Sequence, residues 1–459
     1  MPSISTGTSR PTLFHKTAYG ALAANSISTI MEYPKRYSDD KLDCMAQLWP
    51  SKESLLAFYD AFEGNIFFDL NLHNKPAIEP FLDWWQEVGL INPVCIPEST
   101  NQTERQELLT QIKKAIEKNP IINIDGVVVE LTGLCNLRCQ QCFRGEAWRD
   151  ETEMSLDMLK MAIHPLLRAG IRRIQITGGE PTLRPDKLVG FLAYVKDYMY
   201  FGNIADTANT NSIDPYFDVI EINSNGTYGK SAELLERIRA LGLTDLVSFS
   251  VSLDYPDDKQ KTDQTRRMAG TYDKVIEFTE TARSLGFQVD HLTLSDRSWA
   301  NLGNAADYET NSFFSFDYYS SSLSFRLFDC GLDTPYFSLG KIRIRNGQAG
   351  FCQYAYALPE EFGNLTNHPI VEILNNGLMN SRSMRIISDG LERFVPEIDR
   401  NIFPKHFSSP CIPRNILLAY ASWKEVFMEQ GDSETAAIAK ANRIVGIKYG
   451  YLPRETLLV

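Results

Sequence analysis

The chain has 459 residues and a mass of 52.0 kDa, enough for about two to four domains. Hydrophobic residues make up 43% and charged residues 23%, which excludes a chain that is mostly disordered or mostly coiled coil. The formal charge of -12 and the pI near 5.2 argue against a protein that coats nucleic acid or an anionic membrane. The sequence has no apolar run of membrane-spanning length and no secretory signal, so we expect a cytoplasmic protein with reduced cysteines and without nucleic-acid or membrane partners.

Residues 1–118 form the first predicted domain, a small α+β unit. Apolar residues at helical spacing predict helices over Ser54–Phe62 and Ala77–Val88, with an extended segment between them. Thr103–Lys118 is predicted to be a mostly solvated connecting helix. The pattern faintly resembles the small winged-helix elements that bind leader peptides in peptide-modifying systems. A structural cap on the next domain fits the same pattern, and both interpretations stay open.

Strands alternate with helices over residues 119–328. The predicted strands are Gly126–Thr132, Arg172–Thr177, Asp218–Ser224, Leu246–Leu253, Phe287–Leu294 and Leu323–Phe328. The predicted helices are Ser155–Ala169, Pro185–Tyr200, Ser231–Ala240 and Tyr272–Leu285. This alternation is typical of a parallel sheet with right-handed crossovers. We therefore predict an α/β fold with a partial (β/α)6 barrel, whose chemistry lies at the C-terminal ends of the strands.

Three of the eight cysteines follow the first predicted strand within eight positions, as Cys135, Cys139 and Cys142. Three buried thiols or part of a zinc site are the alternatives. A structural zinc site takes four protein ligands, however, and no fourth Cys or His lies close by in the sequence. An iron–sulfur cubane also takes four ligands, one per iron, so three cysteines leave one iron open to a small molecule. The spacing favours an iron–sulfur cluster.

Polar groups also mark the ends of the next three predicted strands. They are Gly178-Gly179-Glu180-Pro181 after the second strand, Ser224-Asn225-Gly226-Thr227 at the end of the third, and Ser252 and Asp254 at the end of the fourth. A Gly-Gly or Asn-Gly pair alone is usually only a turn. Because the C-terminal ends of parallel strands share one end of a barrel, we expect these three groups and the three cysteines after the first strand to meet there.

The cysteine spacing followed by Gly-Gly-Glu-Pro resembles the radical S-adenosylmethionine (SAM) superfamily, over roughly residues 120–330. The resemblance implies that Cys135, Cys139 and Cys142 hold a four-iron cluster whose open iron is chelated by SAM. It also implies one-electron reduction of that cluster by a partner such as flavodoxin or ferredoxin.

The resemblance further implies which residues bind SAM. Gly178, Gly179, Glu180 and Pro181 form the motif whose backbone polar groups face the methionyl amine, with glycine needed for close approach. Ser224, Asn225, Ser252 and Asp254 are candidates for the carboxylate and the ribose hydroxyls, and Arg266 for bidentate binding of the carboxylate. Gln141 stands where the family usually has an aromatic residue or His, so only its backbone is expected to meet the adenine.

Residues 329–415 resemble the auxiliary-cluster extensions called SPASM and twitch domains. Cys330, Cys352 and Cys411 are their candidate ligands, and Arg414 replaces the second thiolate of a Cys-x-x-Cys pair. We therefore expect one auxiliary four-iron cluster of the twitch type; buried small residues are the alternative. Residues 416–459 are predicted to form C-terminal helices over Ile416–Gly431 and Ser433–Val445.

Three functions of different classes fit the sequence. The first is a radical SAM oxidoreductase or maturase that cleaves SAM to a 5′-deoxyadenosyl radical and cross-links or oxidises a ribosomally made peptide, which the N-terminal unit favours. The second is a radical SAM enzyme that oxidises or rearranges a small metabolite. The third is a non-catalytic iron–sulfur electron carrier. This class is the least favoured, because an electron carrier that does not bind SAM has no use for the Gly-Gly-Glu-Pro motif and the polar strand ends.

Overall fold

The structure is a computed structural model, and the part of the chain that it describes falls into segments. These are residues 13–31, 35–71, 75–94, 96, 100–117, 124, 126–139, 142, 153–199, 218–293, 341–345, 347–350, 358–359, 363–377, 381–403, 411–449 and 452. The predicted strand Leu323–Phe328 lies outside these segments, as do Gln141, Cys330 and Cys352.

The N-terminal unit is a small α+β fold built on a three-stranded antiparallel sheet of order β2-β1-β3. Its elements are β1 Leu13–Lys16, α1 Ala18–Met31, α2 Lys35–Ala46, α3 Lys52–Phe62, β2 Phe67–Asp69, α4 Lys75–Ile78, the 3₁₀ turn η1 Glu79–Phe81, α5 Leu82–Glu87, β3 Ile91–Pro93 and α6 Gln102–Glu117. The helix predicted over Ala77–Val88 is broken into α4, η1 and α5. Pro80 lies at the start of η1, where its missing N–H and its ring prevent an uninterrupted helix.

The central part of the chain alternates strands and helices, as predicted. Its elements are β4 Gly126–Thr132, α7 Leu156–Arg168, β5 Arg173–Gly178, the 3₁₀ turn η4 Pro181–Leu183, α8 Pro185–Val195, the 3₁₀ turn η5 Lys196–Tyr198, β6 Val219–Ser224, α9 Ser231–Arg239, β7 Val247–Ser252, α10 Lys259–Arg266, α11 Thr271–Ser284 and β8 Gln288–Leu292. Strands β4 to β8 pair in parallel and in chain order. Ser155 caps the N-terminus of α7, because its hydroxyl accepts a hydrogen bond from the Met158 amide at 3.1 Å. The α/β fold class with a parallel, partial-barrel sheet is confirmed.

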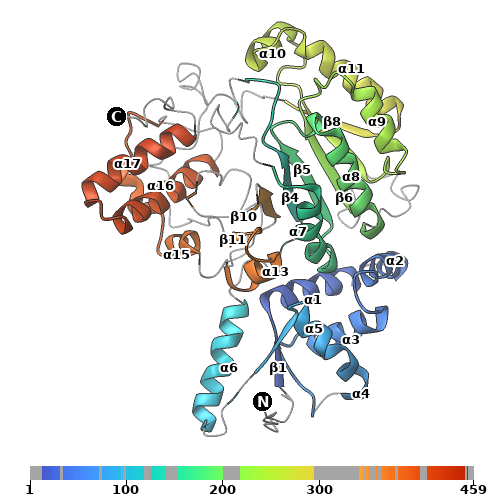
Figure 1. Ribbon diagram of the computed structural model, residues 1–459, viewed down its shortest axis with the longest axis vertical. Coiled ribbons are helices and arrows are strands. Elements are labelled where there is room, and N and C mark those ends of the chain that lie inside the picture. The colour runs from blue at the N-terminus through green and yellow to red at the C-terminus, as the bar shows by residue number, and fades with distance from the viewer. Residues whose placement is uncertain are drawn as a thin grey trace, which may run out of the picture.

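Alternation along the strands separates an apolar face from a polar one. Val127 and Val129 of β4 and Ile174 and Ile176 of β5 are buried in the main hydrophobic core. Helices α7, α8, α9 and α11 lie along this sheet (Figure 1). The residues between these positions therefore point to the opposite, inner face of the sheet.

A sixth parallel strand joins the sheet from the C-terminal part of the chain. The segment KIRIR, which the sequence placed in the auxiliary extension, forms β9 Lys341–Arg345 and pairs in parallel with β4. The sheet order is therefore β11-β10-β9-β4-β5-β6-β7-β8, in which β10 Gln348–Gly350 and β11 Gly363–Asn364 continue antiparallel. Strand β9 is thus the last parallel strand on the side of the sheet opposite β8, with β10 and β11 beyond it.

The remaining C-terminal elements are helical. They are α13 Ile370–Glu372, the π-helical turn η8 Ile373–Gly377, α15 Arg382–Ser388, the 3₁₀ segment η9 Glu392–Glu397, α16 Cys411–Glu429 and α17 Glu434–Lys448. Helix α16 begins five residues before the predicted start at Ile416, because Pro413 falls in its first turn, where proline is tolerated. None of the helices in the described segments combines the length and apolarity needed to cross a membrane.

The N-terminal unit packs where helix α7 leads into strand β5 (Figure 1). The Trp49 indole N–H donates to the Arg168 carbonyl at 3.2 Å, and Arg168 Nε donates to the Leu48 carbonyl at 3.1 Å. The Tyr19 hydroxyl donates to the Pro165 carbonyl at 2.8 Å. These contacts lie at the N-terminal ends of the barrel strands, opposite the end that carries the cysteines.

The same unit also contacts the C-terminal extension. The Asn375 side chain accepts from the Tyr19 amide at 2.8 Å and donates to the Gly89 carbonyl at 3.1 Å. A Cβ at Gly89 would meet Val371 at 2.5 Å, so glycine is needed for this close approach as well as for its φ of 79°. The N-terminal unit therefore contacts both of the other parts of the chain.

A buried ion pair between Lys41 of α2 and Asp218 before β6 gives a prediction for this interface. The two side chains are 6% and 1% exposed. We expect Lys41→Met to lower the free energy of unfolding by about 3–5 kcal/mol, because Asp218 would keep a buried charge without this cation. Urea denaturation measures the change. Lys52→Met removes the exposed pair with Asp43, and this control should cost only about 0–1 kcal/mol. Equal losses in the two variants would contradict the prediction.

Candidate functional site

The C-terminal ends of β4 and β5 are joined directly by their backbones. The amide of Gly179 donates to the Thr132 carbonyl at 2.7 Å, and the amide of Glu180 donates to the Leu134 carbonyl at 2.6 Å. We call residues 133–142 the cysteine loop. The Gly-Gly-Glu-Pro segment therefore holds the start of the cysteine loop in place.

The two glycines are required by this contact. A Cβ at Gly178 would lie 2.3 Å from the Thr132 carbonyl oxygen, and one at Gly179 would lie 2.0 Å from that of Leu134. The resemblance to the radical SAM superfamily implies that glycine is needed at these positions because SAM approaches the backbone closely. The chain's own backbone supplies a second reason, because any side chain here would push the cysteine loop away from β5.

Glu180 connects the ends of β5 and β6 with its carboxylate. The residue is 1% exposed. Oε1 accepts from the Thr182 amide at 3.1 Å, the Thr182 hydroxyl at 2.6 Å and the Ser224 hydroxyl at 2.9 Å, and Oε2 accepts from the Asn225 amide at 2.6 Å. Burial raises the pKa of Glu180, while these four hydrogen bonds act in the opposite direction. The side chain therefore organises the site from within the protein.

The end of β6 also touches the cysteine loop. Asn225 Nδ2 donates to Asn136 Oδ1 at 2.9 Å and lies 3.8 Å from the Cys135 sulfur. Asn136 Nδ2 in turn donates to the Thr227 hydroxyl at 2.8 Å. The sequence did not single out Asn136; its place between two of the cysteines was the only signal. The hydroxyl of Ser224 is already engaged by Glu180, so its contact with SAM stays a prediction.

Beyond β7, Asp254 and Arg266 form a buried pair that reaches the cysteine loop. Arg266 Nε donates to Asp254 Oδ2 at 2.7 Å and Nη2 donates to Oδ1, which makes the pair bidentate. The third guanidinium nitrogen, Nη1, lies 3.7 Å from the Cys139 sulfur. Asp254 also accepts from the Thr265 hydroxyl at 2.9 Å. Arg266 is thus oriented by Asp254 and directs positive charge at a cysteine.

The cysteine thiols are partly buried and close enough to affect one another. Burial raises the pKa of Cys135. It also raises the pKa of Cys139 to about 11, although the nearby positive charge of Arg266 lowers that value. The charge of Cys142 raises both pKa values further, and the charge of Cys135 also raises that of Cys139. An iron cluster would bind thiolates, so its binding would be coupled to the release of protons.

The donor set of the cysteine loop fits a four-iron cluster. Three thiols in one loop would ligate three irons and leave the fourth open. A cubane uses one thiolate for each iron, so its three sulfur ligands stand apart. Hydrogen bonds to sulfur from the Leu137 amide at 3.5 Å, Asn225 and Arg266 are of the kind that tune such clusters.

The other predicted site residues have more limited descriptions. Pro181 is buried and begins η4, and Ser252 ends β7 half-buried. Gln141, Cys330 and Cys352 lie outside the described segments, and only the backbone of Cys411 is described, as the first residue of α16. The auxiliary site therefore stays a prediction.

The inner face of the sheet carries charged side chains near this end of the barrel. Arg345 of β9 pairs with Glu130 of β4, with Nε and Oε2 3.2 Å apart, and both residues are buried. The Ser250 hydroxyl of β7 donates to Glu221 of β6 at 2.7 Å. A molecule that reached this face would meet polar groups of both signs.

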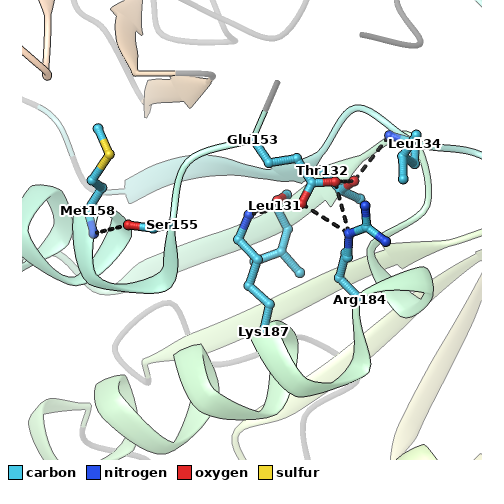
Figure 2. A network of polar contacts seen from close by, with 8 residues as sticks. All are labelled: Leu131, Thr132, Leu134, Glu153, Ser155, Met158, Arg184 and Lys187. Carbon is cyan, nitrogen blue, oxygen red and sulfur yellow. Dashed lines mark hydrogen bonds and ion pairs between the residues drawn. The ribbon is translucent and has the colours of Figure 1, made fainter. Parts of the chain in front are cut away.

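A second network that the sequence did not predict lies at the base of the cysteine loop (Figure 2). It centres on Glu153, which binds Thr132 of β4 and Arg184 and contacts Lys187 of α8. No sequence motif marks Glu153, because its partners come from two separate segments, the end of β4 and the start of α8.

The chain is similar to known proteins over its central part. Residues 129–297 match the family model described as Radical SAM superfamily. A GTP 3′,8-cyclase of Campylobacter fetus subsp. fetus is 29% identical over 178 residues, 38% of this chain and 48% of that protein. The mycofactocin maturase MftC of Mycobacterium tuberculosis H37Rv is 28% identical over 158 residues, 34% of each chain. The chain thus spans about a third to a half of the length of these curated relatives.

Two solved structures align over a larger share of the chain but only weakly. SuiB of Streptococcus suis bound to S-adenosylmethionine has a TM-score of 0.37 at 13% identity, covering 67% of this chain and 77% of that one. Native anSMEcpe with bound AdoMet has a TM-score of 0.36 at 12% identity, covering 70% and 99%.

Proposed function

We propose, from the premise that residues 129–297 form a radical SAM domain, that this chain is an enzyme that cleaves SAM reductively and abstracts hydrogen from a ribosomally synthesised peptide. The observation that carries the proposal is the convergence of N–H donors from the end of β6 and from the end of helix α10 on the cysteine loop. Asn225 faces the Cys135 sulfur and Arg266 faces the Cys139 sulfur.

The bound groups would supply the chemistry, and the chain would supply binding and orientation. Cys135, Cys139 and Cys142 would hold a four-iron cluster, and that cluster would supply the one electron that reductive cleavage of SAM requires. The amides of Gly179 and Glu180 already donate to the carbonyls of Thr132 and Leu134. Carbonyl oxygens are therefore what this segment can offer to the ammonium group of SAM. On the inner face of the sheet, Glu130 and Arg345 would orient polar groups of the substrate.

The names of the relatives support two classes of substrate. The maturase of mycofactocin supports the proposed role as a maturase acting on a peptide. The GTP 3′,8-cyclases support a second candidate, an enzyme that rearranges a small molecule such as a nucleotide. We also propose a flavodoxin or ferredoxin as the reductant and a second four-iron cluster on Cys330, Cys352 and Cys411.

Anaerobic turnover tests the proposed function. Protein reconstituted with iron and sulfide and reduced with dithionite should convert SAM to 5′-deoxyadenosine and methionine, measured by liquid chromatography. Protein that holds iron at the cysteine loop yet gives no 5′-deoxyadenosine would contradict the proposal. Stimulation by a short peptide encoded beside this chain would support the peptide substrate. Stimulation by GTP, with conversion of the nucleotide, would support the second candidate instead.

A further inference from the structure

The cysteine loop follows a β-bulge at the end of β4. The register between β4 and β5 shifts between Glu130 and Thr132, so Leu131 is an extra residue. Such a bulge re-aims the side chains that follow it. Thr132 accordingly points toward Glu153, Arg184 and Lys187 (Figure 2).

A chain of hydrogen bonds runs from the cysteine loop to Glu153. The amide of Leu134, next to Cys135, donates to the Thr132 hydroxyl at 3.1 Å, and this hydroxyl donates to Glu153 Oε1. Thr132 is 1% exposed. The position of Leu134 therefore depends on a carboxylate that lies beyond the far end of the loop in sequence.

Two cations hold the Glu153 carboxylate in place. Arg184 Nε lies 3.0 Å from Oε1 and 3.1 Å from Oε2, and Lys187 Nζ lies 3.5 Å from Oε2. Lys187 also donates to the Leu131 carbonyl at 2.7 Å, so it fixes the bulge itself. The Glu153 and Lys187 side chains are only 15% and 13% exposed. Burial alone would raise the pKa of Glu153, but these hydrogen bonds and cations together lower it, which keeps the carboxylate charged.

We propose that Glu153 is a positioning residue of the cluster site, which fixes the entry to the cysteine loop through Thr132 and Leu134. The proposal rests on the proposed function, because it requires a cluster on Cys135, Cys139 and Cys142. The hydrogen bonds and ion pairs of Glu153 with described residues go to Thr132, Arg184 and Lys187, so in this proposal it acts by ordering the loop before the cluster binds. Its loss should therefore weaken the hold on iron more than it weakens the fold.

The test compares Glu153→Gln and Thr132→Val with Asp186→Asn as the control. Asp186 is a carboxylate at the start of α8, the helix that carries Lys187. It pairs with Arg237 of α9 at 2.8 Å, away from the loop. Thr132→Val keeps the side-chain shape and removes only the hydroxyl, so it decides the question if Glu153→Gln fails to fold. Iron release from the reconstituted protein into a ferrous chelator is followed anaerobically, after subtraction of iron that a Cys135/Cys139/Cys142→Ala variant retains.

We expect both test variants to release iron about tenfold faster than wild type and the control to match wild type. A second readout is the difference in unfolding midpoint between cluster-loaded and iron-free protein, which reports how strongly the cluster binds the folded state. This difference should shrink in both test variants. If loaded and iron-free forms lost equal stability, with unchanged release, Glu153 would be only structural and the proposal would be overturned. If wild-type protein held no more iron than the Cys135/Cys139/Cys142→Ala variant, the proposed function itself would be overturned. The iron content of wild-type protein therefore separates this outcome from a failure of the Glu153 proposal.

Discussion

Replacing Cys135, Cys139 and Cys142 together by alanine should lower the rate of 5′-deoxyadenosine formation to the protein-free background, a loss on the order of a thousandfold or more. The reason is that no other described residue near the loop offers a thiolate. Cys44→Ala is the matched control, since Cys44 is a half-buried cysteine of α2 in the N-terminal unit. Its activity should equal that of wild type. Formation of 5′-deoxyadenosine by the triple variant would refute the assignment of the cluster ligands.

The same variant reports on the proposed auxiliary cluster. Wild-type protein should hold about eight irons per chain and the triple variant about four, at four irons per cubane. A folded triple variant without iron would contradict the auxiliary cluster and make Cys330, Cys352 and Cys411 ordinary core residues. Iron analysis and circular dichroism on the same samples distinguish these outcomes.

Glu180→Gln is expected to destabilise the site strongly. The carboxylate accepts four hydrogen bonds and donates none. An amide in its place would turn an N–H₂ group toward groups that are themselves donors, leaving buried donors unsatisfied. We expect a loss of about 2–4 kcal/mol in the free energy of unfolding, together with weaker binding of iron.

Denaturation of iron-free protein in urea measures the loss for Glu180→Gln. Glu372→Gln is the control, because the Glu372 side chain is 51% exposed and its pair with His368 lies on the surface. The control should change stability by less than about 1 kcal/mol. A Glu180→Gln variant as stable as the control would show that the strand ends do not depend on this carboxylate.

The order of strands β4 to β8 and the convergence of their ends were predictable from the sequence. Apolar β-branched runs such as Gly126–Thr132 separate cleanly from amphipathic helices, and parallel pairing then places the ends of the strands together. The gathering of Cys135, Gly179 and Asn225 at one end follows from these rules alone.

The side-chain partners within the site were not predictable. Whether Glu180 faces a ligand or the protein depends on tertiary contacts with Ser224 and Asn225, which lie far along the chain. The Glu153 network depends on a bulge in β4, and no pattern of residues in the sequence predicts this bulge. The place of β9 beside β4 could not be inferred either, because its short alternating pattern fits any edge of any sheet.

The pairing of β9 with β4 has a consequence for the order of assembly during synthesis. Lys341 pairs with Gly126, so this edge of the sheet cannot close until most of the chain has left the ribosome. The described residues that surround the cysteine loop, from Thr132 to Arg266, emerge long before β9. Since chains fold from the N-terminus as they are made, the nascent polypeptide can form the pocket for iron while the C-terminal third is still being translated. Metal delivery and translation can thus overlap in time, with β9 joining β4 afterwards.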